Sequence, residues 1–88
     1  MRVAVYDTYV TKRDGTVMHF DIIVPNYLKN EQIIHNYGKQ FLKSKGQEGQ
    51  PLSSKECRFY HVVQGMGKML VHINTKGYAI IEMEGCKS

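Results

Sequence analysis

Residues 5–25 read VYDTYVTKRDGTVMHFDIIVP, and this stretch decides the fold because it describes two strands joined by a turn. β-Branched residues and tyrosines dominate on both sides of Asp14-Gly15, a pair that tolerates the positive φ angles of a tight turn. The sequence therefore predicts a hairpin with strands at 3–10 and 16–24. Alternation along the second strand assigns four side chains to the core: Met18, Phe20, Ile22 and Val24.

Two registers of this hairpin place its polar residues differently. If residues 13–15 form a three-residue loop, with the glycine in the left-handed conformation, Asp7 lies opposite Asp21. Tyr9 then lies opposite His19, and all four side chains share the face away from the core. If the loop has two residues instead, the partner of Asp7 belongs to the other face and the group is dispersed. The sequence leaves both registers open.

The first register would bring together a cluster of polar side chains that could bind a ligand or take part in a reaction: Asp7, Tyr9, His19 and Asp21. Two facing carboxylates raise the pKa of one of them, and a neighbouring histidine can exchange a proton near neutrality. Such a group suits general acid–base catalysis or a divalent cation site. The alternative is a solvated sheet face whose aspartates bond to nearby threonines or backbone amides. No complete catalytic motif accompanies the cluster, so a non-catalytic binding or interaction module is the leading hypothesis, and a small enzyme the rival.

Further along the chain the pattern predicts two helices and two more strands. A proline at 25 ends the second strand, because it has no N–H for a β-ladder. The elements expected after it are a helix over Asn30–Lys45, a loop over 46–54, a strand over Cys57–Gln64, a helix from Met66 that stops at Gly77, and a strand over Tyr78–Glu84. Gly38 lies inside the first helix, which predicts a close approach between that helix and the sheet.

The order β-β-α-β-α-β predicts one α+β domain over residues 1–88, a two-layer sandwich. A strand–helix–strand unit prefers a parallel crossover, so we expect a mixed four-stranded sheet with both helices on one face. Such a sheet leaves strand edges exposed, and proteins commonly cover edges by forming dimers. A homodimer is therefore expected.

Two weaker candidate sites lie in the second half of the chain. A transition-metal site could use Cys57, His61 and Cys86, because a C-x₃-H pair on a regular strand places both side chains on one face. The alternative assigns Cys57 to the core and His61 to the surface. An anion site could use Gly65, Gly67 and Lys68, although the residues around them do not complete a phosphate-binding loop.

Composition limits the other classes of function. The 88 residues carry a net charge of +4, but Lys39, Lys43 and Lys45 gather at the end of a predicted helix, where cations complement the helix dipole. Aromatic residues do not alternate with them, so nucleic-acid binding is not expected. No apolar run approaches the roughly 20 residues of a membrane span, and no secretory signal opens the chain. A cytoplasmic location with reduced cysteines is expected, and no cofactor is expected beyond a divalent metal.

Three strings together resemble one family over nearly the whole chain: VYDTYVTKRDGTVMHFDIIVP, YGKQFLKSKGQEGQPLSSKECRFYH and GYAIIEMEGC. They are similar to the small bacterial proteins called domain of unknown function twenty twenty-four. The resemblance implies a compact α+β domain with a mixed sheet, and it implies no activity. It also implies a second cysteine beside the histidine of the central motif; Tyr60 stands there in this chain, which weakens a cysteine-based metal site.

Overall fold

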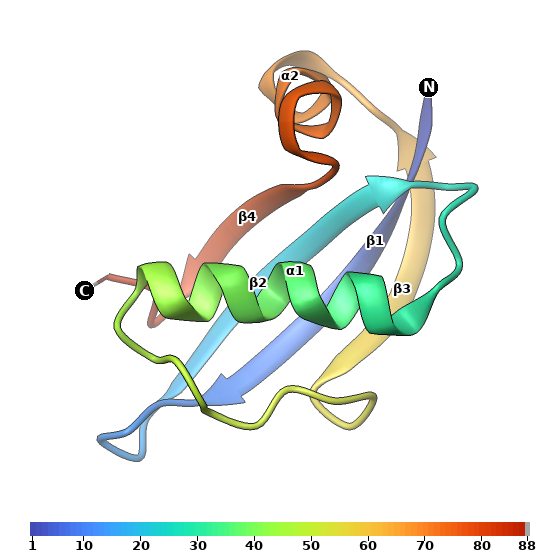
Figure 1. Cartoon of the computed structure of the whole chain (residues 1–88). Coiled ribbons are helices and arrows are strands. Elements are labelled where there is room, and N and C mark those ends of the chain that lie inside the picture. Colours follow the sequence, from blue (N-terminus) through green and yellow to red (C-terminus); the bar gives the residue numbers. More distant parts are fainter. Residues whose placement is uncertain (88) are drawn as a thin grey trace.

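A computed structural model describes residues 1–87 and shows a four-stranded sheet with two helices (Figure 1). The elements follow the predicted order: β1 (Arg2–Thr11), β2 (Val17–Pro25), α1 (Glu31–Ser44), β3 (Cys57–Gln64), α2 (Gly67–Lys76) and β4 (Ala79–Glu84). Neither helix is long and apolar enough to cross a membrane within residues 1–87. The α+β class is confirmed.

The hairpin adopts the three-residue loop. Asp7 pairs with Asp21 and Tyr9 with His19 across β1 and β2. Gly15 takes φ +88, and the backbone N–H of Lys12 donates to the carbonyl of Thr16 at 2.7 Å. The first of the two registers is therefore the one that forms.

The sheet is antiparallel throughout, so the expected mixed sheet is wrong. The strand order is β3-β1-β2-β4, and every neighbouring pair is antiparallel. β2 and β3 do run in the same direction, as a crossover through α1 favours. β1 lies between them, however, so these two parallel strands never share a ladder.

The helices cover opposite faces, which also differs from expectation. Ile34, Phe41 and Leu42 of α1 pack in one core cluster with Phe20 and neighbouring residues of the same sheet face. Ile73 of α2 packs in a second cluster with Val3, Val5, Ile23 and Ala79, which point to the other face. The reason is the uninterrupted run Ile22-Ile23-Val24, which is buried on both faces and needs cover on both.

α1 begins at a capped terminus and lies close to the sheet. The side-chain oxygen of Asn30 accepts a hydrogen bond from the backbone N–H of Ile33 at 3.2 Å. A Cβ on Gly38 would lie 2.6 Å from Leu52 Cδ1 and 2.9 Å from Ile22 Cδ1. The predicted close approach at this glycine is confirmed.

The two helices leave half of one sheet face open. α1 crosses the middle of its face at an angle to the strands, whereas α2 lies at one end of the sheet (Figure 1). The second cluster therefore covers only the end of β1 and β2 near Val3 and Ile23. The other end of that face carries Asp7, Tyr9 and His19, with Tyr9 half exposed at 50%. We call this uncovered half the open face.

Candidate functional site

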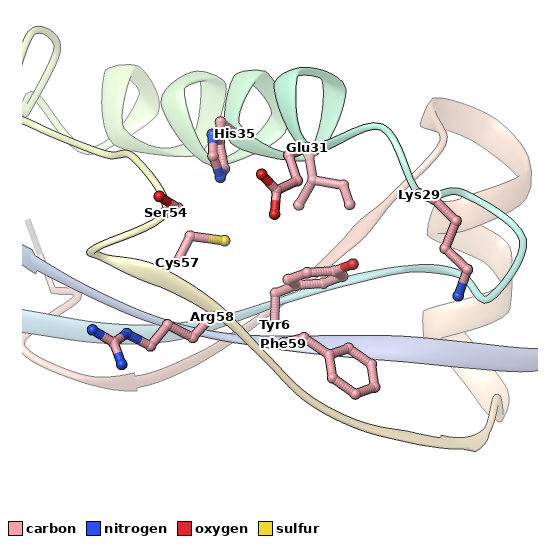
Figure 2. Close-up of a pocket in the computed structure, with 9 residues that line it drawn as sticks. Tyr6, Lys29, Glu31, His35, Ser54, Cys57, Arg58 and Phe59 are labelled. Carbon is pink, nitrogen blue, oxygen red and sulfur yellow. The ribbon is translucent and has the colours of Figure 1, made fainter.

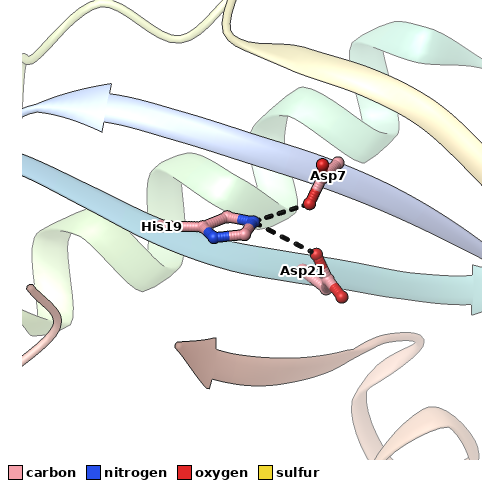
Figure 3. A group of neighbouring side chains, drawn as sticks. All are labelled: Asp7, His19 and Asp21. Atoms are coloured by element: carbon pink, nitrogen blue, oxygen red, sulfur yellow. Dashed lines mark hydrogen bonds and ion pairs between the residues drawn. The ribbon is translucent and has the colours of Figure 1, made fainter. Parts of the chain in front are cut away.

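Three ionisable side chains meet at the centre of the open face (Figure 3). Asp7 comes from β1, and His19 and Asp21 come from β2. His19 Nε2 lies 2.6 Å from Asp7 Oδ1 and 3.9 Å from Asp21 Oδ1. Their potential ligand atoms all lie within 4.8 Å of one another, the one such group of three or more in residues 1–87. The register thus assembles the cluster that the sequence offered as an alternative.

Tyr9 completes the cluster by covering the imidazole. Its ring stacks on the His19 ring with centroids 4.0 Å apart and planes 12° apart. The stacked ring fixes the orientation of His19 and leaves Nε2 directed at the two carboxylates (Figure 3). All four candidate residues of the hairpin therefore lie together.

Asp21 is the unusual member of the group. It is only 6% exposed, and its Oδ1 has no hydrogen-bond partner within residues 1–87. Burial, followed by the hydrogen bond and the charge of Asp7, raises the pKa of Asp21 to about 6. A buried oxygen without a donor costs free energy unless a proton or a cation satisfies it.

Asp7 behaves in the opposite way. Burial opposes its ionisation, but hydrogen bonds from His19 and Asp21 outweigh burial and hold the pKa of Asp7 below its ordinary value. A protonated Asp21 can therefore donate to an ionised Asp7. The pair shares one proton near pH 6, because two carboxylates this close resist joint ionisation.

Apolar side chains lie around the cluster on the open face, and the sequence did not indicate those that come from β4. Ile81 of β4 pairs with Asp21 and is 41% exposed. Met83 is the extra residue of a bulge beside His19, and Val17 begins β2; both are about half exposed. Val17 shares the face of His19 within β2, whereas only the register of β4, which the sequence leaves undetermined, places Ile81 and Met83 at the site.

The candidate metal site in the second half is not assembled, because a β-bulge separates its residues. Val5 pairs with His61 and Tyr6 with Phe59, so Tyr60 has no partner on β1. The bulge turns His61 to the face of Val5, whereas Cys57 is buried in the α1 cluster. The expected common face for the C-x₃-H pair is therefore wrong.

Both cysteines are buried, and they form no disulfide bond with each other. Burial is the main cause that raises the pKa of each thiol. The Cys86 thiol donates to the backbone carbonyl of His19 at 3.3 Å. Cys86 therefore supports the strand that carries His19 and is not assembled with Cys57 and His61 as a ligand set in residues 1–87.

Structural roles account for the two glycines of the candidate anion site. Gly65 is buried, and a Cβ there would lie 2.6 Å from Leu70 Cδ2. Gly67 takes φ +56 at the start of α2, and the N-cap residue Met66 makes no side-chain cap. Lys68 follows on the exposed surface. Anion binding at these residues stays a prediction.

Comparison with known proteins agrees with this fold. The family model described as domain of unknown function (DUF2024) matches residues 1–83. The chain belongs to this family. The NMR structure of protein NE1680 from Nitrosomonas europaea is 40% identical, covers 99% of this chain and 100% of its own, and superposes with a TM-score of 0.84. No curated protein gives a significant match.

Proposed function

We propose that the protein is a non-catalytic binding module that holds a divalent metal ion at Asp7, His19 and Asp21. One observation carries this proposal: the Oδ1 atom of Asp21 is buried, lacks a hydrogen-bond donor within residues 1–87 and lies 3.9 Å from His19 Nε2. An ionised carboxylate only accepts, so above pH 6 this atom lacks the partial or full positive charge that a hydrogen-bond donor or a cation provides. A cation bound between the three side chains supplies it.

The donor set selects the class of ion. Imidazole favours zinc and neighbouring transition metals, whereas calcium and magnesium prefer oxygen ligands alone. Zinc bonds to nitrogen and carboxylate oxygen at about 2.0–2.2 Å, which separates ligands in a tetrahedral site by about 3.3 Å. The present separations of 2.6 and 3.9 Å from Nε2 lie on either side of that value. To hold zinc, Asp7 Oδ1 would move away from His19 Nε2, and Asp21 Oδ1 would move towards it, each by less than about 1 Å.

Zinc binding must displace a proton. His19 Nε2 now lies 2.6 Å from Asp7 Oδ1, a hydrogen-bond distance that places a proton between the two atoms. A metal ion needs the Nε2 lone pair, and it also competes with the proton on Asp21. Its affinity therefore falls as the pH drops below about 6, where Asp21 becomes protonated.

Isothermal titration of tag-free protein with zinc chloride tests the proposal. We expect saturable one-to-one binding at pH 7.5, and at least about 100-fold weaker binding for Asp21→Asn and for His19→Gln. His61→Gln is the matched control, because His61 is an exposed histidine on the same sheet face but outside the cluster. Equal affinity in all four proteins, or no zinc binding in any, would rule the site out.

Acid–base chemistry is the second candidate, and the elevated pKa of Asp21 beside an ionised Asp7 favours it. A pH titration of the Asp21 carboxyl group, followed by carbon-13 NMR with and without zinc, distinguishes acid–base chemistry from metal binding. A midpoint near pH 6 that zinc does not shift would favour proton exchange. A midpoint that zinc moves to lower pH supports metal binding. The homodimer expected from the exposed strand edges stays a prediction.

A further inference from the structure

A second site of a different kind lies on the α1 face of the sheet. A cavity of about 370 Å³ opens between the first half of α1, the strand β1 and the start of β3 (Figure 2). Glu31, Ile34 and His35 form its helical wall, since residues three and four apart share one side of a helix. Tyr6 and Cys57 form its floor. Its volume lies within the range of small-molecule sites.

The wall carries the carboxylate of Glu31, which is exposed in the first turn of α1, where the helix dipole favours a negative charge, and which has no cationic side chain beside it among the described residues. Within residues 1–87, no cationic group lies within 4.0 Å of Glu31. Lys29 sits at the far end of the cavity, where its Nζ donates to the side chain of Asn26 at 3.4 Å. The Arg58 guanidinium points away from Glu31 (Figure 2). Neither lining cation therefore neutralises Glu31.

The negative charge of Glu31 has an electrostatic effect on the two residues of the cavity floor. Burial raises the pKa of Tyr6 most, and the charges of Cys57 and Glu31 raise it further. Burial also raises the pKa of Cys57, and Glu31 adds to that effect. The negative charge of Glu31 disfavours negative charge on Tyr6 and Cys57, and by the same electrostatic effect it favours a positively charged ligand in the cavity.

The remaining walls suit an organic cation better than a metal ion. The Phe59 ring packs edge-on against the Tyr6 ring, with centroids 5.7 Å apart and planes 72° apart. Aromatic rings attract ammonium groups through their faces. The ligand atoms of Glu31, His35 and Cys57 do not form a group within 4.8 Å, unlike those around His19. One metal ion cannot bridge them, whereas a molecule of several atoms can.

We propose that this cavity binds a small primary ammonium ion with a branched apolar body. The ammonium group contacts the Glu31 carboxylate, and the apolar body lies against the rings of Tyr6 and Phe59, of which Phe59 is 55% exposed. Such a ligand places a positive group beside the one carboxylate of the lining and covers the apolar part of that lining. This site is independent of zinc binding, because Tyr6 and Asp7 are consecutive residues of β1 and point to opposite faces.

Nitrogen-15 NMR titration with 3-methylbutylamine at pH 7 tests this proposal. We expect shifts confined to the residues that line the cavity, with a Kd on the order of 1 mM for so small a molecule. The neutral analogue 3-methylbutan-1-ol and the anion 3-methylbutanoate should each bind at least about tenfold more weakly. Equal binding of the amine and the alcohol to the wild-type protein would overturn the proposal without any variant.

Two variants locate the ammonium group. Glu31→Gln should weaken binding of the amine about tenfold and leave binding of the alcohol unchanged. Glu48→Gln is the matched control, since Glu48 is an exposed glutamate in the loop that follows α1. Tyr6→Leu retains the carboxylate but removes the aromatic floor, and it should weaken the amine more than the alcohol. Unchanged amine binding in Glu31→Gln would contradict the assignment.

Discussion

Asp21→Asn is expected to raise the free energy of unfolding by about 1–3 kcal/mol at pH 8 in the absence of metal. Burial raises the pKa of Asp21 to about 6, whereas an unfolded aspartate titrates near 3.8. That difference corresponds to about 3 kcal/mol of destabilisation once Asp21 is ionised. The lowered pKa of Asp7 offsets part of it. An amide of the same shape removes the buried charge and can donate to Asp7.

The pH dependence of this effect has a defined sign. Between about pH 4 and pH 6 the folded protein holds a proton on Asp21 that the unfolded chain has released, so the contribution of Asp21 to stability falls as the pH rises. Above pH 6 the loss is complete. Wild type and Asp21→Asn should therefore have similar stability near pH 4 and diverge up to about pH 6.

Urea denaturation at pH 4, 5, 6 and 8 measures this difference. Glu84→Gln is the control, because Glu84 pairs with His19 from β4 but is exposed. It should change stability by less than about 0.5 kcal/mol. A variant Asp21→Asn that is less stable than wild type at pH 8 would show that the carboxylate is well solvated or well paired.

Zinc should reverse the order of stability. A ligand that binds only the folded state stabilises it by about 4.1 kcal/mol at 1,000 times its Kd, which exceeds the advantage of about 1–3 kcal/mol expected for Asp21→Asn. Wild type should gain that amount from zinc, and Asp21→Asn should gain little. The buried carboxylate would then be a residue that lowers stability in the apo protein and is retained for binding.

Phe20→Ala should produce the largest loss of stability, about 3–5 kcal/mol. Phe20 is fully buried at the centre of β2, and its ring packs on the Phe41 ring of α1 with centroids 4.6 Å apart. Removing it opens a cavity between sheet and helix that the rigid hairpin cannot close. The loss is a large fraction of the stability of a domain of this size.

Thermal or urea unfolding of Phe20→Ala checks this expectation. Phe59→Ala is the comparison, since Phe59 is 55% exposed on β3. It should cost less than about 1.5 kcal/mol. Similar losses for the two variants would mean that α1 is not held to the sheet through Phe20.

The sequence predicted each element well and the relations between elements less well. Alternation and turn residues located the hairpin and limited its register to two choices. The order of the strands in the sheet could not be predicted from alternation and turn residues. The crossover through α1 determines that β2 and β3 run in the same direction, but it does not determine which strand lies between them. The run Ile22-Ile23-Val24 did carry a signal for cover on both faces, since a strand buried on both sides loses its alternation.

The candidate site shows the same limits. Asp7, Tyr9, His19 and Asp21 could be named from local pairing alone. The bulge at Tyr60, which separates His61 from Cys57, has no local marker such as glycine or proline. Two of the apolar residues around the cluster, Ile81 and Met83, come from β4, about 60 residues away in the chain, and Met83 lies at a second bulge.

The loop at residues 13–15 has a consequence for how this chain can vary. Surface turns usually accept insertions and deletions, because no packing depends on their length. Here the loop length sets the parity of pairing between β1 and β2. If the loop lost one residue, Asp7 would pair with a residue whose side chain points into the core. One strand would then have to bury its charged side chains or expose its apolar ones. The hairpin can therefore exchange residues in this turn, but it cannot lose one of the three without dismantling the cluster.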